Sequence, residues 1–291
     1  MKAIIFGANG QDGQYLYKVL QRSNIECLGV SRSGNWINGH VEDNLFVENL
    51  IKINRPEFIF HLAANSTTHH SAIIENHLTI CQGTLNILES AIKHSPFSRI
   101  FLSGSGLQFR NINLPIHEMD PFEALSGYAA CRIHTSYLAR YYRSLGMKVY
   151  MGYFFNHESP RRPERHMSRK IAMAVRRISL GSEEKIEVGD GTVKKEWTYA
   201  GDVAEAIFIL VNQEEIFESV IGSGEAHSID EWVDCCFGLI GENASNHVVR
   251  KEIFTPEYKL LVSNPSTILS LGWKPTVSFQ ELASMLVNHI E

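Results

Sequence analysis

Short runs of apolar residues alternate with longer amphipathic stretches over the first half of the chain. The short runs are KAIIFG at 2–7, ECLGVSR at 26–32, FIFHLAA at 58–64 and RIFLSGS at 99–105. Between them lie stretches of helical length, such as QYLYKVLQRS at 14–23. Strands that alternate with helices of this length indicate βαβ units and a parallel sheet covered on both faces. The pattern predicts an α/β fold with a doubly wound parallel sheet.

The regular alternation ends near residue 155. From about Pro160 the chain has a basic stretch, RRPERHMSRKIAMAVRRI, then a glycine-rich turn, VGDGTVKKEW, and short helical segments. Irregular C-terminal segments of this kind form a smaller lobe over the carboxyl edge of the sheet, where ligands bind. We expect residues 1–155 to form the sheet domain, with the chain returning to it later, and 156–291 to form mainly the ligand-binding lobe.

Composition narrows the choice of partners. The 291 residues are 44% hydrophobic and 20% charged, with a net charge of −5, as in ordinary globular proteins. No general basic surface favours nucleic acid or an acidic membrane. The N-terminal apolar run is too short for a signal sequence, and we find no apolar stretch long enough to cross a bilayer. We expect a cytoplasmic protein with neither nucleic acid nor membrane as partner.

The cysteine and histidine spacings give no metal-binding pattern. The five cysteines are odd in number and none form a Cys-x-x-Cys pair, so neither a disulfide framework nor a zinc site is expected. His69 and His70 are adjacent, and their side chains point apart. His61, inside an apolar run, is expected to be a core histidine.

The first predicted strand leads into a glycine turn. Gly7, Gly10 and Gly13 form a G-x-x-G-x-x-G pattern between that strand and the next helix. Glycines let the backbone approach a pyrophosphate, which binds the free N–H groups at the helix N-terminus. The context predicts a dinucleotide-binding, or Rossmann, domain over residues 1–155.

The end of the second strand distinguishes the two nicotinamide cofactors. An NAD site favours an acidic side chain there for the ribose 2′-hydroxyl. This chain has Ser31, Arg32 and Ser33 instead, which suit a 2′-phosphate. The sequence therefore favours NADP, with NAD as the alternative.

The stretch SGYAACR at 126–132 places Tyr128 and Arg132 one helical turn apart. This spacing, the glycine turn and the order of elements resemble the extended short-chain dehydrogenase/reductases, or NAD-dependent epimerase/dehydratase family. Within them, GANGQDGQYL at 7–16, GYFFNHESPRRPERHMSRKI at 152–171 and LGWKPTVSFQEL at 271–282 are similar to motifs of the GDP-mannose 4,6-dehydratase family. The likeness spans nearly the whole chain.

The resemblance implies roles for individual residues. Cofactor contacts are expected from Gly7, Asn9, Gly10, Gln11, Asp12, Gly13, Arg32, Asp43, Ala63, Tyr128 and Arg132. A GDP-linked sugar is expected to contact Asn156, Glu158, Arg161, Lys170 and Lys195. The catalytic residues are expected to be Tyr128, Arg132 and Ser105. Family members commonly pair through two helices that flank the sheet, which implies a homodimer or homotetramer.

Arg132 stands where the family has a lysine beside its tyrosine. In the family, the tyrosine exchanges a proton with a sugar hydroxyl while hydride passes between sugar C4 and the nicotinamide. A cation one turn away stabilises the tyrosine anion. Arginine keeps the charge but is effectively never deprotonated, so Arg132 is suited to electrostatic support and not to relaying a proton.

Two further positions depart from the dehydratases. Aligned on a shared leucine, Gly104 and Gly106 replace the family's threonine and general-base glutamate, and Ser105 remains. Loss of a positioned acid–base group costs ~10²–10⁴ in rate. The step concerned is removal of the C5 proton and expulsion of the C6 hydroxyl. Glu118 and Glu123 are alternative carboxylates for it.

The nucleotide-binding motifs are also altered. Lys195, Glu196 and Trp197 occupy positions of the family's arginine, aspartate and tryptophan, and FTPEYKLL lacks the arginine of a phosphate-binding motif. These changes are compatible with guanine and a different sugar, such as a heptose.

Three functions therefore compete. The first is an NADP-dependent oxidoreductase or ketoreductase acting at C4 of a GDP-linked hexose or heptose. The second is a GDP-mannose or GDP-heptose 4,6-dehydratase with substituted catalytic groups. The third is a nucleotide-sugar-binding relative without turnover.

Overall fold

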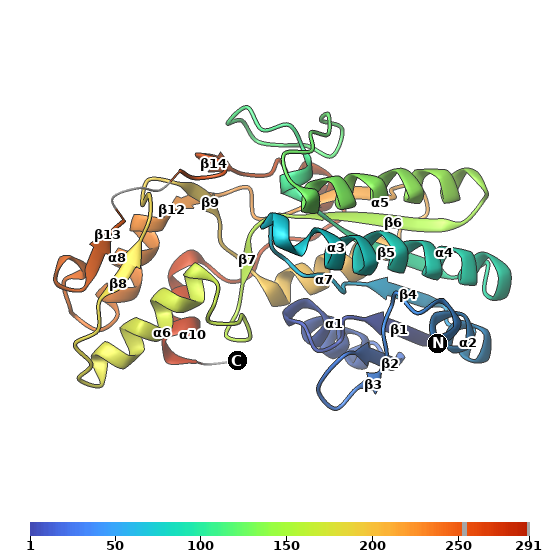
Figure 1. The fold of residues 1–291 in the computed structure, drawn as a ribbon, viewed down its shortest axis with the longest axis horizontal. Helices are drawn as coiled ribbons and strands as arrows, with labels where there is room; N and C mark the ends of the chain where they lie inside the picture. The colour runs from blue at the N-terminus through green and yellow to red at the C-terminus, as the bar shows by residue number, and fades with distance from the viewer. Residues whose placement is uncertain (252–254, 290–291) are drawn as a thin grey trace.

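The computed structural model describes residues 1–251 and 255–289. Its largest layer is a parallel sheet of seven strands (Figure 1). In spatial order these are β11 (Glu218–Ile221), β6 (Lys148–Phe154), β5 (Arg99–Ser105), β4 (Phe58–His61), β1 (Lys2–Phe6), β2 (Glu26–Ser31) and β3 (Ile37–Asn38). The chain order reverses beside β1, as in doubly wound folds. The prediction of such a sheet is confirmed.

Helices cover both faces because side chains along each strand alternate between them. On one face, Ile4 and Phe6 pack with α2 (Asn44–Asn54), α4 (Gly83–His94) and α5 (Gly127–Ser144). On the other, Ala3 and Ile5 pack with α1 (Gln11–Arg22) and α7 (Ala200–Val211). The central strand β1 is therefore apolar on both faces, and α7 joins this layer although it follows residue 156.

The segment before α4 is an interrupted helix. It runs through the 3₁₀ turn η1 (His70–Ala72), α3 (Ile73–Asn76) and the π-helical turn η2 (His77–Gln82) into α4. A π turn inserts extra chain into a helix and is frequent at functional sites. The π-helical turn packs against α5.

A smaller lobe extends from one end of the sheet (Figure 1, left). Its helices are α6 (Met167–Ser179), α8 (Ile229–Gly238) and α10 (Phe279–Asn288), whose core includes Trp197 stacked on Trp232 with ring centres 4.3 Å apart. Its short strands are β7 (His157–Glu158), β8 (Ile186–Val188), β9 (Lys194–Glu196), β10 (Thr198–Tyr199), β12 (Ala226–Ser228), β13 (Val248–Arg250) and β14 (Leu260–Leu261).

The remaining elements are the short helix α9 (Ser266–Ser270) and the 3₁₀ turns η3 (Gly106–Gln108) and η4 (Ala244–Asn246). No helix within the described ranges has the length and apolar character needed to cross a membrane.

Candidate active site

A cavity of about 440 Å³ lies at the carboxyl ends of β1, β5 and β6, between the sheet and the smaller lobe. A second hollow of about 310 Å³ adjoins it and shares Gly7 and Gly10. Crevices at this edge of doubly wound sheets are where ligands bind. The first cavity is lined by residues that include Gly7, Gly10, Gln11, Asp12, Gly13, Gly104, Ser105, Tyr128, Arg132, Asn156, His157, Arg162, Arg165, His166, Glu257 and Tyr258.

The glycine turn leaves no room for side chains. Gly7 has φ +94°, and a Cβ there would lie 2.6 Å from the amide nitrogen of Ala63. A Cβ at Gly13 would lie 2.3 Å from the carbonyl oxygen of Gly7. Helix α1 begins directly after Gly10, so its free N–H groups face the cavity edge. This bare backbone cradle fits a pyrophosphate.

The second hollow places Asn9, Arg32 and Ala63 together beside the glycine turn. Arg32 is held there by Glu75, whose Oε1 accepts from its Nη1 at 3.0 Å. Asp43 is not among the described lining residues: its carboxylate caps α2 by accepting from the Phe46 amide at 3.1 Å. The preceding Glu42 lines the hollow instead.

Arg32→Ala is expected to weaken NADP binding about 10–100-fold and to change NAD binding little, because a hydrogen bond to a charged group contributes ~1.5–3 kcal/mol. Glu75→Gln releases Arg32 and should tighten NADP binding a few-fold. Calorimetric titration of both variants with both cofactors measures this. Equal losses for NAD and NADP in Arg32→Ala would mean that Arg32 does not contact a 2′-phosphate.

Asp12 and His157, which both line the cavity, form a partly buried pair. Oδ1 of Asp12 lies 2.9 Å from Nε2 of His157, whose Nδ1 faces the Phe155 carbonyl at 2.8 Å. Burial alone would raise the pKa of the Asp12 carboxyl, but His157 and then Arg162 hold it at about 2. Burial opposes protonation of His157, and the Asp12 charge still raises the pKa of His157. The Asp12 carboxylate is therefore paired with His157.

Tyr128 lies in the first turn of α5, which Ser126 caps by accepting from the Ala129 amide at 3.1 Å. Tyr128 is 8% exposed and Arg132 is 5% exposed. The guanidinium carbon of Arg132 lies 5.1 Å from the centre of the Tyr128 ring, within the range of a cation–π contact. The helix thus brings the predicted tyrosine and its cation together at the cavity.

Arg132 is anchored to β5. Its Nη1 donates to the carbonyl and, at 2.9 Å, to the hydroxyl of Ser103, while within the described residues its Nε has no partner. His61 is buried nearby, with Nε2 3.1 Å from the Thr79 carbonyl. Burial and then the Arg132 charge lower the pKa of His61 to about 4. A neutral His61 leaves Arg132 as the cation beside Tyr128.

Aromatic rings occupy the space beside Gly104 and Gly106, the two glycines predicted to replace the dehydratase threonine and glutamate. A Cβ at Gly104 would lie 2.5 Å from Cδ1 of Tyr153, and one at Gly106 would lie 2.9 Å from Cζ of Phe155. Ser105 lines the cavity and caps η3, accepting from the Leu107 amide at 3.2 Å. Neither glycine can take a side chain unless its neighbour moves.

Gly104→Ala is therefore expected to destabilise the fold by about 1–3 kcal/mol, the cost of overpacking a tight core. Gly238→Ala is the matched control, since a Cβ there meets nothing within 4 Å, and its stability should be unchanged or up to about 1 kcal/mol higher. Thermal unfolding of both variants measures the difference. Equal midpoints would mean that strand β5 has room for a side chain at Gly104.

The alternative carboxylates are not placed at the Tyr128 cavity. Glu118 is buried between Val220, whose amide donates to it at 3.1 Å, and Thr267. Glu123 is exposed. Neither is among the described lining residues of the two hollows, so the structure gives no support for recruiting either of them.

Of the residues predicted to hold the sugar nucleotide, Asn156 lines the cavity, with Oδ1 3.5 Å from the Tyr258 hydroxyl. The other four are not among the described lining residues. Glu158 is buried, 3.5 Å from Nε of Arg162. Lys195 is also buried, 4.4 Å from the Trp197 ring centre.

The two remaining predicted cations have other surroundings. Arg161 contacts Gln14 and lies over the Tyr15 ring on α1. Lys170 is exposed on α6.

The cationic groups that do line the cavity are Arg162, Arg165 and His166, from the same basic stretch. Burial and then the Arg162 charge lower the pKa of His166 to about 4. The sequence indicated this stretch but not which side chains face inward, because 160–166 has no helical or strand period to fix them. In FTPEYKLL, Glu257 and Tyr258 line the cavity, and Phe254 lies outside the described residues.

Comparisons with known proteins identify related sequences and folds. A family model described as GDP-mannose 4,6 dehydratase matches residues 4–286. GDP-mannose 4,6 dehydratase 1 of Arabidopsis thaliana is 30% identical over 320 residues, which cover 98% of this chain and 88% of the plant protein.

Two solved structures show the same fold. The UDP-glucose 4-epimerase of Thermus thermophilus in complex with NAD has a TM-score of 0.86 at 20% identity, covering 99% of this chain and 98% of that chain. RMD from Pseudomonas aeruginosa complexed with NADPH has a TM-score of 0.85 at 19% identity, covering 99% and 97%.

Proposed function

The chain belongs to the GDP-mannose 4,6-dehydratase family of extended short-chain dehydrogenase/reductases, and from that premise we propose that it transfers hydride between NADP and C4 of a GDP-linked sugar. The observation that carries the proposal is the pairing of Tyr128 and Arg132 at the wall of a cavity that begins at the glycine turn. Nicotinamide, when bound, supplies or accepts the hydride.

Tyr128 is proposed to exchange the proton of the C4 hydroxyl. Its phenol must lose this proton to act as a base, and the Arg132 guanidinium, fixed by Ser103, stabilises the resulting negative charge. Ser105 is proposed to position the sugar by hydrogen bonding. The diphosphate is proposed to lie against Arg162 and Arg165, since guanidinium groups pair well with phosphate oxygens.

Two outcomes of this chemistry differ in the fate of the C6 hydroxyl. Family membership favours the dehydratase alternative. The packing of Gly104 and Gly106 against Tyr153 and Phe155 favours oxidation or reduction without elimination. The carboxylates among the described lining residues are Asp12, paired with His157, and Glu257, in contact with Thr68. We therefore propose the oxidoreductase reaction and treat dehydration as the second candidate.

The size of the sugar is proposed to exceed that of a hexose. A further hollow of about 190 Å³ shares Leu107, Glu257 and Tyr258 with the main cavity and includes Gly106. This volume adjoins the position where dehydratases carry their glutamate. An additional carbon, as in a GDP-linked heptose, would have space there.

NADP is proposed as cofactor because Arg32 lines the hollow beside the glycine turn. Relatives with this fold have been solved with NAD and with NADPH, so NAD stays the alternative. The cytoplasmic location expected from the sequence also stays a prediction.

A homodimer is proposed from exposed apolar side chains on neighbouring helices. Ile74 on α3, Leu78 on η2, and Tyr137 and Tyr141 on α5 are all exposed. Exposed apolar patches mark association surfaces. Two such pairs would give a homotetramer, and sedimentation velocity distinguishes the two assemblies from a monomer.

The function is tested by incubating the protein with NADP and GDP-mannose, then with GDP-manno-heptose, in both redox states of the cofactor. Reduced-nicotinamide absorbance and product mass are followed. A two-hydrogen mass change supports the oxidoreductase, and loss of water without net cofactor reduction supports the dehydratase. Tight binding with no change in mass would support the third function, a nucleotide-sugar-binding relative that has no turnover.

A further inference from the structure

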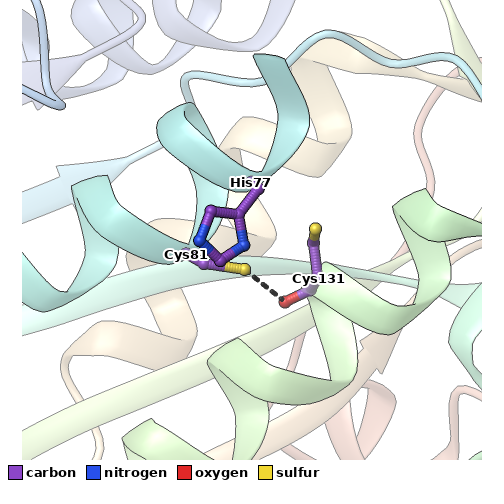
Figure 2. Close-up of side chains that lie close together, drawn as sticks. All are labelled: His77, Cys81 and Cys131. Carbon is purple, nitrogen blue, oxygen red and sulfur yellow. Dashed lines mark hydrogen bonds between the residues drawn. The ribbon is translucent and has the colours of Figure 1, made fainter. Parts of the chain in front are cut away.

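Three side chains with strong metal affinity converge where η2 packs on α5. The ligand atoms of His77, Cys81 and Cys131 all lie within 4.8 Å of one another. Figure 2 shows His77 and Cys81 on one helix facing α5, from which Cys131 projects. Cys81 and Cys131 are buried, and His77 is exposed.

The local geometry explains this convergence. His77 and Cys81 are four residues apart in the π-helical turn, so they share one face of it. Cys131 follows Tyr128 by three residues and faces the same way on α5, in a small core with Ile80 and Tyr128. The Cys81 thiol and the Cys131 carbonyl are 3.8 Å apart, which is a weak contact for a buried thiol. Both cysteines are free, so both sulfurs are available as ligands.

We propose that His77, Cys81 and Cys131 bind one Zn²⁺ ion, which ties the π-helical turn to the helix that carries Tyr128. Thiolate sulfur and imidazole nitrogen are the ligands that zinc prefers, at about 2.3 and 2.0–2.1 Å. Small side-chain rotations bring three atoms that are already this close to a common centre. Binding converts both thiols to thiolates and releases two protons to solvent.

The three side chains provide three of the four ligands of a tetrahedral zinc ion. A water molecule is proposed as the fourth, since His77 is exposed and opens the site to solvent.

A disulfide between Cys81 and Cys131 is the competing use of the two thiols. It needs an oxidant such as peroxide and has no role for His77. The exposed imidazole beside two buried sulfurs instead gives a metal ion a path from solvent to its ligands. The zinc ligands take no part in the proposed reaction. The zinc proposal can therefore be tested without knowing the substrate.

The test uses untagged full-length protein, treated with chelator under reducing conditions and then titrated with Zn²⁺ by calorimetry. Co²⁺ is the spectroscopic probe, because tetrahedral thiolate ligation gives sulfur-to-cobalt charge-transfer absorption. Cys81→Ser and Cys131→Ser should each weaken Zn²⁺ binding more than about 100-fold, since even the groups that only orient metal ligands contribute ~10–100-fold. His77→Ala should weaken it about tenfold or more.

Cys235→Ser on α8 is the matched control and should bind Zn²⁺ like the parent protein. One equivalent of Zn²⁺ bound by the parent, with a rise in its Tm, supports the site. Absence of a first equivalent, or a cobalt spectrum without thiolate absorption, overturns it without any variant. Unchanged Zn²⁺ binding in Cys131→Ser also overturns the site. So does a protein that binds no Zn²⁺ when reduced and loses two hydrogens in mass on peroxide treatment, because it forms the disulfide instead.

Discussion

Tyr128→Phe is expected to lower the rate of hydride transfer by about 10²–10⁴-fold, the contribution of a positioned acid–base group. The substitution removes the hydroxyl and keeps the ring that packs with Ile80 and Cys131. Binding of NADP and of the GDP-linked sugar should therefore change less than about threefold, since the cavity keeps its shape. Stopped-flow absorbance of reduced nicotinamide separates the hydride step from product release.

Tyr137→Phe is the control for this variant. Tyr137 lies on the same helix but is 58% exposed and contacts Phe122, away from the cavity. Its loss of a hydroxyl should leave turnover unchanged. Undiminished hydride transfer in Tyr128→Phe would remove Tyr128 from the mechanism, and equal effects in both variants would indicate a change in helix α5 as a whole.

The fold was predictable because its signals are local and repeated. The long strands of the large sheet are apolar runs, and amphipathic stretches between them fix the parallel order. The glycine turn was predictable from its local spacing after the first strand. The structure shows why glycines are needed there: a Cβ at Gly7 or Gly13 would collide with neighbouring backbone. The resemblance to the dehydratase family is confirmed by the match over residues 4–286.

Side-chain direction in irregular segments was not predictable. The basic stretch after Asn156 was identified, yet Arg161 turns to α1 while Arg162 and Arg165 line the cavity. A one-residue difference of this kind is set by tertiary contacts with Gln14 and Glu158. Sequence spacing carries no information about it.

The packing around Gly104 and Gly106 is also a tertiary property. The sequence shows only that glycines stand at the positions aligned with the threonine and glutamate. It does not show whether there is space to restore those side chains. In the structure Tyr153 and Phe155 occupy the space. A side chain at either glycine therefore requires these aromatic residues, on and directly after β6, to move as well.

The expectation that the chain has no metal site rested on spacing along the sequence. Cys81 and Cys131 are fifty residues apart, and only Cys81 has a histidine of the group, His77, on its own helical segment. The proposed zinc ligands become neighbours only when η2 packs on α5. Short-range motifs cannot report such a group.

Arg132→Met is expected to lower hydride transfer about 10²-fold, comparable to losing one charged or hydrogen-bonding group that stabilises a developing anion. Methionine keeps much of the apolar stem against the Tyr128 ring but leaves that ring without its cation and Ser103 without its donor. Arg132→Lys keeps a positive charge and should stay within about tenfold of the parent or exceed it. Steady-state and single-turnover rates of the two variants measure the contrast.

A second measurement separates this electrostatic role from packing. The Arg132 charge helps to hold the pKa of His61 at about 4. Removing that charge in Arg132→Met should raise the pKa of His61, although burial keeps it below the ordinary 6.5, whereas Arg132→Lys should leave it near the parent value. Imidazole resonances followed by NMR across the acid and neutral pH range give both values. Equal hydride-transfer rates in the methionine and lysine variants, or a His61 pKa that does not change, would show that Arg132 acts through shape and not through charge.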